Sequence, residues 1–113
     1  MTKQWPRLTA STQAVLNSIL AADDDDPAYG LRVCEETDLG PGTVYPILER
    51  LAEIGWLEST WEDGAPSGRP RRRYYKITGK GRVELAAARA AREARKRRWS
   101  GLFSPSPAPG GTA

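Results

Sequence analysis

The sequence lacks several residue types on which common protein chemistry depends. It contains no histidine, so the most frequent general base and the most frequent metal ligand are both absent. A single cysteine, Cys34, excludes an internal disulfide and argues against a cysteine-based metal site. No set of residues suited to catalysis remains. We therefore expect a protein that is not an enzyme and needs no cofactor.

Long apolar runs are also missing. No stretch approaches the roughly 18 apolar residues that a membrane-spanning helix needs. Residues 1–8 do not show the basic-then-apolar pattern of a secretion signal. These absences predict a cytoplasmic protein that does not enter a membrane. The length of 113 residues is typical of one domain with a modest core, and many such domains gain stability by pairing.

Positive charge is concentrated in the second half of the chain. Residues 1–68 carry four basic side chains against twelve acidic ones, which gives a net charge of −8. Residues 69–113 carry thirteen basic side chains against two acidic ones, which gives +11. A basic segment of this density indicates an anionic partner, with nucleic acid favoured over a membrane surface.

The spacing of apolar residues predicts three helices in the first half. They cover about residues 11–22, 28–37 and 41–54, and a turn at 38–42 separates the second from the third. The third helix has apolar side chains at offsets of three, four, seven and ten residues, namely Val44, Ile47, Leu48, Leu51 and Ile54. Gly55 is placed to end this helix in a left-handed conformation.

Three smaller features refine these helices. Thr9 or Ser11 can cap the first helix. Pro46 lies near the start of the third helix, where we expect it to distort the helix rather than end it. The second helix is expected to turn Tyr29, Val33 and Cys34 inward.

The second half begins with two runs that are typical of strands. Residues 56–62 and 72–78 are rich in Trp, Thr, Tyr and Ile, and the nine residues between them are mostly turn formers. They predict a hairpin with an extended tip. Thr78 can cap a last, alanine-rich helix at about 79–99, and the Pro, Gly, Ser and Ala of residues 100–113 predict a disordered tail.

This order of elements predicts an α+β fold, mostly helical, of the winged helix-turn-helix type: three helices, a two-stranded hairpin wing and a long C-terminal helix. In such folds the second helix of the helix-turn-helix pair lies in the major groove, with its first residues nearest the base edges. The wing carries four arginines within five positions, Arg69, Arg71, Arg72 and Arg73. Cations at the tip of a hairpin favour contact with double-stranded DNA over simple solvation.

Two sequence blocks make this prediction more specific. The third helix contains Gly42-Thr43-Val44-Tyr45-Pro46, and Gly55-Trp56-Leu57-Glu58 follows it. The wing contains Gly68-Arg69-Pro70-Arg71-Arg72-Arg73-Tyr74-Tyr75-Lys76-Ile77-Thr78, with Gly81 beyond it and Pro27-Ala28-Tyr29-Gly30 upstream. Over about residues 8–85 the chain resembles the PadR family of bacterial transcriptional regulators.

The resemblance implies a function and a domain organisation. PadR proteins are typically dimeric winged-helix repressors of inverted-repeat operators, and many respond to small aromatic or drug-like ligands. We therefore expect a sequence-specific regulator that pairs as a homodimer and is released by a small aromatic effector. Its parts would be an N-terminal arm (1–10), a DNA-binding winged helix-turn-helix domain (11–78), a dimerisation helix (79–99) and the tail (100–113).

The resemblance also implies where DNA is read. The outward face at the start of the third helix, with Thr43, Tyr45 and Pro46, would enter the major groove. A competing interpretation is that Thr43 only caps the helix. We expect Tyr74 and Tyr75 to be structural, one packed on the third helix and the other on the open face of the sheet.

Affinity for the DNA backbone has to come largely from outside the third helix. Arg50 is its only cation, and it can reach a phosphate or pair with Glu49 or Glu53. Lys3 and Arg7 and the four wing arginines are the other candidates. Because side chains alternate along a strand, we do not expect the wing arginines to contribute equally.

The resemblance places the dimer on the first and last helices. The candidate interface residues are Leu16, Leu20, Val83, Ala87, Ala90, Ala94 and Trp99. Because alanine buries little apolar area, a weak dimer is an open alternative. The basic run from Arg89 to Arg98 is compatible with an extra DNA contact or with a solvated face beside an acidic surface.

Two further features and one competing function complete the predictions. The run Asp23 to Asp26 lacks the alternating spacing of a calcium loop, so we expect a solvated turn and no metal. The ligand site is not identified by the sequence; Trp99 is a weak candidate for contact with an aromatic effector. The competing function is a winged-helix interaction module whose basic last helix docks an acidic partner.

Overall fold

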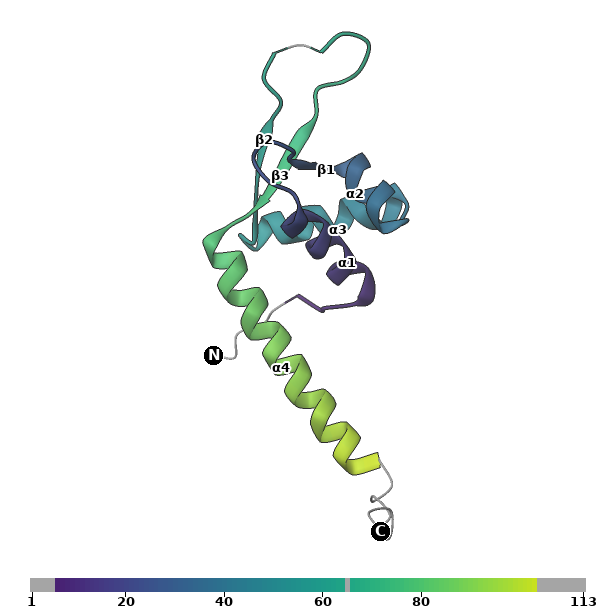
Figure 1. The fold of residues 1–113 in the computed structure, drawn as a ribbon, viewed down its shortest axis with the longest axis vertical. Coiled ribbons are helices and arrows are strands. Elements are labelled where there is room, and N and C mark those ends of the chain that lie inside the picture. Colours follow the sequence, from purple (N-terminus) through teal and green to yellow (C-terminus); the bar gives the residue numbers. More distant parts are fainter. Residues whose placement is uncertain (1–5, 65, 104–113) are drawn as a thin grey trace, which may run out of the picture.

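Seven elements follow one another in the computed structural model, which describes residues 6–64 and 66–103 (Figure 1). They are α1 (Ala10–Ala21), β1 (Ala28–Tyr29), α2 (Gly30–Thr37), α3 (Pro41–Glu53), β2 (Leu57–Trp61), β3 (Arg73–Ile77) and α4 (Gly79–Phe103). This is the mostly helical winged helix-turn-helix fold that the sequence predicts. Within the described residues no helix is both long enough and apolar enough to cross a membrane.

Helix α1 begins where a threonine can satisfy its first free amide. The Thr9 side chain accepts a hydrogen bond of 3.1 Å from the backbone amide of Thr12, as expected for an N-cap. The helix carries no charged residue and buries Val15, Leu16 and Ile19 against the other helices. Helix α1 therefore contributes mainly to the packing of the core.

The prediction for the second helix was wrong at its start. Ala28 and Tyr29 form the short strand β1, which pairs antiparallel with β3 and places Tyr29 opposite Tyr74. The backbone of Tyr29 is extended, and α2 begins only at Gly30. The predicted two-stranded wing, β2 and β3, is consequently extended by β1 into a three-stranded sheet of order β1–β3–β2. Pairing with a strand more than forty residues away overrides the local helical pattern.

The turn and third helix follow the prediction. Asp38 ends α2 in a left-handed conformation with φ of 59°, and α3 begins with a proline in its first turn. The helix continues through Pro46, although this residue has no amide hydrogen to donate to the Gly42 carbonyl one turn earlier. Gly55 follows the helix with φ of 83°, the left-handed conformation that the sequence predicts there.

The core lies between the first three helices and one face of the sheet. Its largest fully buried side chains are Trp56, Leu16, Leu48, Leu51, Val15, Val33 and Val44. Trp56 also donates a hydrogen bond of 2.9 Å from its indole nitrogen to Glu84 on α4. Burial of Val44, Leu48 and Leu51 fixes the orientation of α3, so that the face of the helix opposite these residues points outward.

Helix α4 is longer than the sequence predicts. Its cap is Thr78, whose hydroxyl accepts a hydrogen bond of 2.9 Å from the amide of Gly81. Residues 100–103, expected in a disordered tail, continue the helix, and the first proline that can stop it is Pro105. The rest of the expected tail, residues 104–113, lies outside the described residues.

Only the first half of α4 packs on the winged domain. Leu85 and Ala88 are buried, and Arg89 donates a hydrogen bond of 2.8 Å to the side chain of Asn17 on α1. From residue 95 to residue 102 every side chain is exposed. The helix extends away from the domain on the side opposite the wing, in a molecule that measures 69 × 36 × 26 Å (Figure 1).

Candidate nucleic-acid interface

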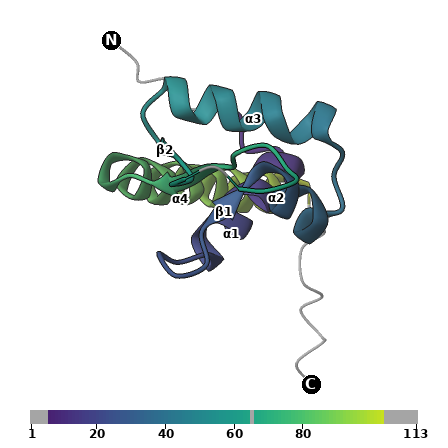
Figure 2. The same cartoon turned by 90° about the horizontal axis from the view of Figure 1, so that it is seen from above.

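Helix α3 presents the predicted reading residues on its exposed face. Thr43, Pro46 and Arg50 lie one turn apart along the helix and are exposed, and Tyr45 beside them is 39% exposed. Seen from above, α3 lies along one outer side of the molecule (Figure 2). The N-cap of α3 is Gly40, so the capping position is not occupied by Thr43. Thr43 is instead an exposed residue in the first turn of the helix.

Two cations flank this face. Arg7 of the N-terminal arm and Arg50 of α3 line one groove of about 350 Å³, together with Thr43 and Pro46. In the part of the chain that the structure describes, Arg50 pairs with neither Glu49 nor Glu53, so its charge is not neutralised within the helix. The groove therefore combines two guanidinium groups with the first residues of α3. The other predicted cation of the arm, Lys3, lies outside the described residues.

The side chain of Tyr45 rests on the start of α2. Gly30 is buried directly beneath its ring, and a Cβ atom at this position would overlap the phenol. In the sequence Gly30 stands out only as part of a motif, and nothing there reveals this contact. Gly30 therefore allows α2 and α3 to approach closely enough to fix the Tyr45 ring on the outer surface.

The wing arginines point to two different faces of the sheet. Arg73 lies on the face that α3 packs against, where its Nε atom donates a hydrogen bond of 2.9 Å to Ser59. Its guanidinium lies 5.6 Å from the centre of the Trp61 ring, and Trp61 is 57% exposed. Arg72 lies on the other face, stacked 4.1 Å above the ring of Tyr29. The alternation predicted from the strand thus separates these two cations.

Tyr75 joins the wing to the outer face of α3. Its side chain is 8% exposed, and burial raises the pKa of its hydroxyl above the ordinary value of 10.0. The charge of Arg73 lowers this pKa, while Tyr45 and Glu49 of α3 raise it. Arg73 and Tyr45 therefore lie close enough to Tyr75 to influence the same hydroxyl. As predicted, the neighbouring tyrosine has a different place: Tyr74 packs edge to face on Tyr29, with ring centres 6.1 Å apart.

The tip of the wing is organised by an acidic residue that the sequence patterns did not reveal. The Glu62 carboxylate accepts two hydrogen bonds of 2.7 Å from Arg69, one on each oxygen. Arg71 donates two more, of 3.1 and 2.8 Å, to the backbone carbonyl of Glu62. The available signal was an acidic residue at the end of one strand facing an arginine run on the next, which is a favourable cross-strand pairing.

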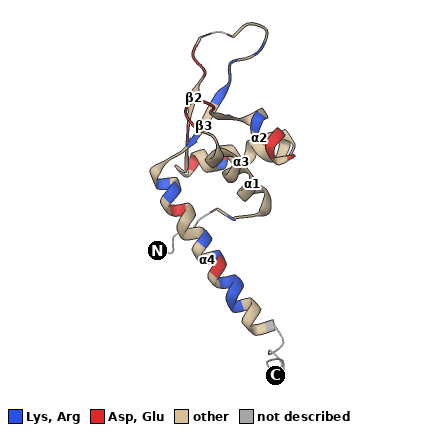
Figure 3. Cartoon of the chain, in the orientation of Figure 1, with Lys and Arg blue, Asp and Glu red and all other residues tan. Residues whose placement is uncertain are grey.

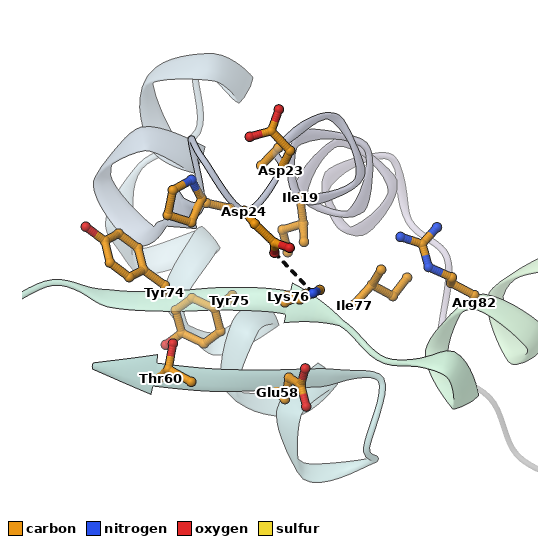
Figure 4. A pocket seen from close by; sticks show the side chains of 13 residues that line it. Ile19, Asp23, Asp24, Glu58, Thr60, Tyr74, Tyr75, Lys76, Ile77 and Arg82 are labelled. Carbon is orange, nitrogen blue, oxygen red and sulfur yellow. Dashed lines mark hydrogen bonds and ion pairs between the residues drawn. The ribbon is translucent and has the colours of Figure 1, made fainter. Parts of the chain in front are cut away.

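A separate groove of about 470 Å³ lies between the α1–β1 loop and the sheet (Figure 4). Lys76 reaches across it to Asp24, with 3.1 Å between the Nζ and Oδ1 atoms. Asp23 accepts backbone hydrogen bonds from Asp25 and Asp26, of 2.9 and 2.8 Å. The acidic run is thus an exposed turn, as the sequence predicts.

The predicted dimer residues fall into three groups. Leu16 is completely buried in the core of its own chain, so its assignment to a dimer surface was wrong. Leu20, Ala87 and Ala94 are half-buried. Three residues on α4 are well exposed: Val83 at 71%, Trp99 at 60%, and Ala90. Val83 does not share the buried side of Leu85, because two residues along a helix turn the side chain by more than half a circle.

Charge is distributed over the molecule in separate regions. Lys and Arg are concentrated on the wing and along α4, whereas most Asp and Glu lie in the α1–β1 loop, α2, α3 and the β2 side of the wing (Figure 3). On α4 the exposed cations include Arg92 and the run from residue 95 to residue 98. This second basic region lies at the end of the molecule opposite the wing (Figure 3).

A helix-turn-helix with an exposed α3 face and an arginine-bearing wing defines a winged-helix DNA-binding protein. The sequence matches the transcriptional regulator PadR-like family over residues 19–87, which is more than half of the chain. The protein therefore belongs to the PadR-like family of transcriptional regulators, and the resemblance inferred from its motifs is confirmed. No curated protein matches the sequence.

Solved structures of the same family show the same fold. A PadR-like transcription factor from Bacteroides fragilis is 27% identical, with 80% of this chain and 88% of that chain covered and a TM-score of 0.60. A PadR family regulator from Clostridium difficile R20291 is 22% identical, with coverage of 82% and 98% and a TM-score of 0.61. One from Bacillus cereus is 21% identical, with coverage of 86% and 93% and a TM-score of 0.58.

The family and the fold support a DNA-binding transcriptional regulator. The family and the similar structures are regulators, not enzymes, which agrees with the lack of a catalytic set of residues noted in the sequence.

Proposed function

We propose that this PadR-like regulator is a homodimeric repressor that binds an inverted-repeat operator, with α3 in the major groove and the wing on the DNA backbone. One observation carries the proposal. The guanidinium of Arg73 lies 6.0 Å from the centre of the Tyr75 ring, and Tyr75 belongs to the core cluster into which α3 packs, so that a reading helix and a wing cation lie on one side of the sheet.

Sequence reading is assigned to the start of α3. Thr43 and Tyr45 carry hydroxyl groups, which can donate to or accept from base edges and phosphates. Their positions in the first turns of α3 are those nearest the bases in a helix-turn-helix. Pro46 offers an apolar contact beside them. Since Arg50 is the only cation of this helix, α3 is better suited to reading than to strong electrostatic attraction.

Grip on the phosphates is assigned to the guanidinium groups around that face. Arg73 approaches from β3, Arg69 and Arg71 from the tip of the wing where Glu62 holds them, and Arg7 and Arg50 from the groove beside Thr43. Arg72 is expected to contribute less, since it is half-buried over Tyr29 on the other face of the sheet. Each neutralised phosphate releases counterions and makes the affinity depend on salt.

A dimer is supported by the exposed length of α4. The described side chains of its last turns, residues 95–102, are exposed, and a helix end exposed to water over this length is marginal unless a second copy covers it. Val83 and Ala90 offer exposed apolar surface on one side of α4, and the exposed Trp99 lies about half a circle round the helix from them. A two-fold protein requires an operator with two-fold symmetry, with half-sites about 34–36 Å apart. We place the small aromatic effector at this interface, beside Trp99.

The test is a fluorescence-anisotropy titration with an inverted-repeat duplex from upstream of the protein's own gene and a scrambled duplex. We expect wild type to prefer the repeat and the double variant Thr43→Ala/Tyr45→Ala to lose that preference, at about 1–3 kcal/mol for each lost base contact. Arg82→Ala, an exposed cation outside the proposed surface, is the matched control and should keep the preference.

Two outcomes would contradict the proposal. Unchanged discrimination in the double variant would show that α3 does not read the bases. No binding of wild type to either duplex, with binding to an acidic protein surface instead, would favour the competing function, an interaction module that uses the basic side of α4.

A further inference from the structure

The tip of the wing has few contacts other than those to Glu62. The loop between β2 and β3 has no further strand pairing beyond one hydrogen bond of 2.7 Å, from the Glu62 amide to the Arg72 carbonyl, among the residues that the structure describes. Gly68 adopts a φ of 82°, a conformation that other residues rarely adopt. A loop of this composition is flexible unless side chains hold it.

Glu62 provides that hold through both its side chain and its backbone. Besides the two bonds from Arg69, its carboxylate accepts one of 3.3 Å from the backbone amide of Arg72 and one of 3.2 Å from the hydroxyl of Tyr74. Its backbone carbonyl accepts the two hydrogen bonds from the Arg71 side chain. Glu62 therefore contacts three of the four wing arginines, and its side chain is only 17% exposed.

The carboxylate stays charged under all conditions in which the protein would bind DNA. The hydrogen bond from Arg69 holds the pKa of Glu62 at about 2, below its ordinary value of 4.5, although burial raises it. The amide of Arg72 and the hydroxyl of Tyr74 lower this pKa further. Because the folded pKa is depressed, the contribution of this group to stability is present above pH 4.5 and is lost as the pH falls toward 2.

An acidic residue among DNA-contacting arginines can act in two opposite ways. It can repel the phosphates and occupy the donors that would bind them, or it can order the arginines before DNA arrives. A guanidinium has five N–H donors, and the carboxylate of Glu62 engages two of those of Arg69. Donors therefore remain for a phosphate, while the cost of ordering a long side chain on binding is already met.

We propose that Glu62 is a positioning residue for the wing, which holds Arg69 and Arg71 in their DNA-binding arrangement in the free protein. This inference rests on the proposed function, in which the wing grips the DNA backbone. Without the Glu62 contacts, Arg69 and Arg71 would still be present, but their guanidinium groups would no longer be held in this arrangement.

Two variants with the same change in charge separate ordering from repulsion. Glu62→Gln removes one negative charge and weakens the Arg69 pair. Asp63→Asn removes one negative charge from the next residue, which is exposed and forms no hydrogen bond or ion pair within the described chain. Repulsion alone predicts that both variants bind duplex DNA more tightly. A positioning role predicts opposite effects: weaker binding in Glu62→Gln, and equal or tighter binding in Asp63→Asn.

We expect Glu62→Gln to lower the affinity for a labelled duplex of any sequence by about three- to tenfold, as for lost ordering of one or two side chains. Asp63→Asn should equal or exceed wild type. Without DNA, the ¹⁵N heteronuclear NOE of the backbone amides of Ser67, Gly68, Arg69, Arg71 and Arg72 should fall in Glu62→Gln and not in Asp63→Asn. The Tm should fall in Glu62→Gln, because the carboxylate contributes to stability at neutral pH, and should change little in Asp63→Asn.

One result would overturn the positioning role of Glu62. Affinity in Glu62→Gln at or above that of wild type would overturn the positioning role and make Glu62 a competitor of phosphate. The double variant Arg69→Ala/Arg71→Ala distinguishes this from failure of the proposed function. If that variant binds like wild type, the wing is not the grip. If it binds weakly while Glu62→Gln does not, only the role of Glu62 fails.

Discussion

Single residues of this protein set the position of side chains far from them in sequence. Gly30 is buried under the Tyr45 ring, and Gly81 is buried against the backbone of Trp56, where an added Cβ atom would lie 2.9 Å from the Trp56 Cα atom. Both glycines are needed for close approach of two elements, not for an unusual backbone conformation. Of the two, Gly30 bears on DNA recognition, because Tyr45 is a proposed contact.

The change Gly30→Ala tests this link at the residue scale. The added methyl group would push the Tyr45 ring from its place, so we expect weaker operator binding together with a stability loss of about 1–3 kcal/mol from overpacking. Thermal unfolding and anisotropy titration measure the two effects. Gly79→Ala is the matched control, since no atom lies within 4 Å of its added Cβ, and it should keep operator affinity.

A wild-type operator affinity in Gly30→Ala would show that Tyr45 is not a contact that needs a fixed position. Sequence patterns could identify Gly30 as part of a block, but not its role. That role depends on Tyr45, fifteen residues later, and only the packing of α2 on α3 brings the two together. The same holds for Glu62, whose partners depend on how the wing loop folds.

At the scale of elements, the wing has a side that faces α3 and a side that does not. Alternation along β3 predicts that adjacent arginines differ, and the structure assigns Arg73 to the α3 side and Arg72 to the Tyr29 side. Arg73 is thus the wing cation that lies beside the proposed reading face. Arg72 stabilises the packing of β1 on β3 by stacking on an aromatic ring.

We expect Arg73→Ala to weaken duplex binding more than Arg72→Ala does. Loss of one phosphate contact should reduce the slope of log affinity against log salt by about 1 in Arg73→Ala and leave it nearly unchanged in Arg72→Ala. Arg72→Ala should instead lower the Tm slightly, through loss of a cation–π contact of about 0.5–1 kcal/mol. A larger loss of affinity in Arg72→Ala would mean that the wing meets DNA with its other face.

Local patterns predicted the helices better than the sheet. The apolar spacing placed α1 and α3 within about two residues of their observed ends, because each helix buries one stripe of side chains. Strand β1 was missed, since two residues carry no periodicity and their pairing with β3 is a long-range contact. The extra turn of α4 was missed because Ser100 and Gly101 suggested an end that no proline enforces there.

At the scale of the whole molecule, the proposed function assigns reading of the bases and attraction to phosphate to different parts. The first 68 residues are strongly acidic in sum, and α3 carries one arginine, so cations from the wing and the arm must supply the attraction to phosphate. Helix α4 continues away from the wing with exposed side chains over its last turns (Figure 1). This arrangement suits a dimer in which α4 joins two winged domains and leaves both α3 faces free.

The measurement that tests this account most directly compares binding to the complete inverted repeat with binding to a single half-site, over a series of salt concentrations. We expect two chains to bind the complete repeat, and binding to the half-site to be much weaker. The logarithm of the affinity should fall linearly with the logarithm of the salt concentration, with a slope of about −0.9 for each phosphate contacted. The variant Val83→Glu/Ala90→Glu, altered only at exposed positions of α4, should stay folded and bind both duplexes equally weakly. Equal affinity of wild type for the two duplexes, or an affinity that does not change with salt, would contradict the account.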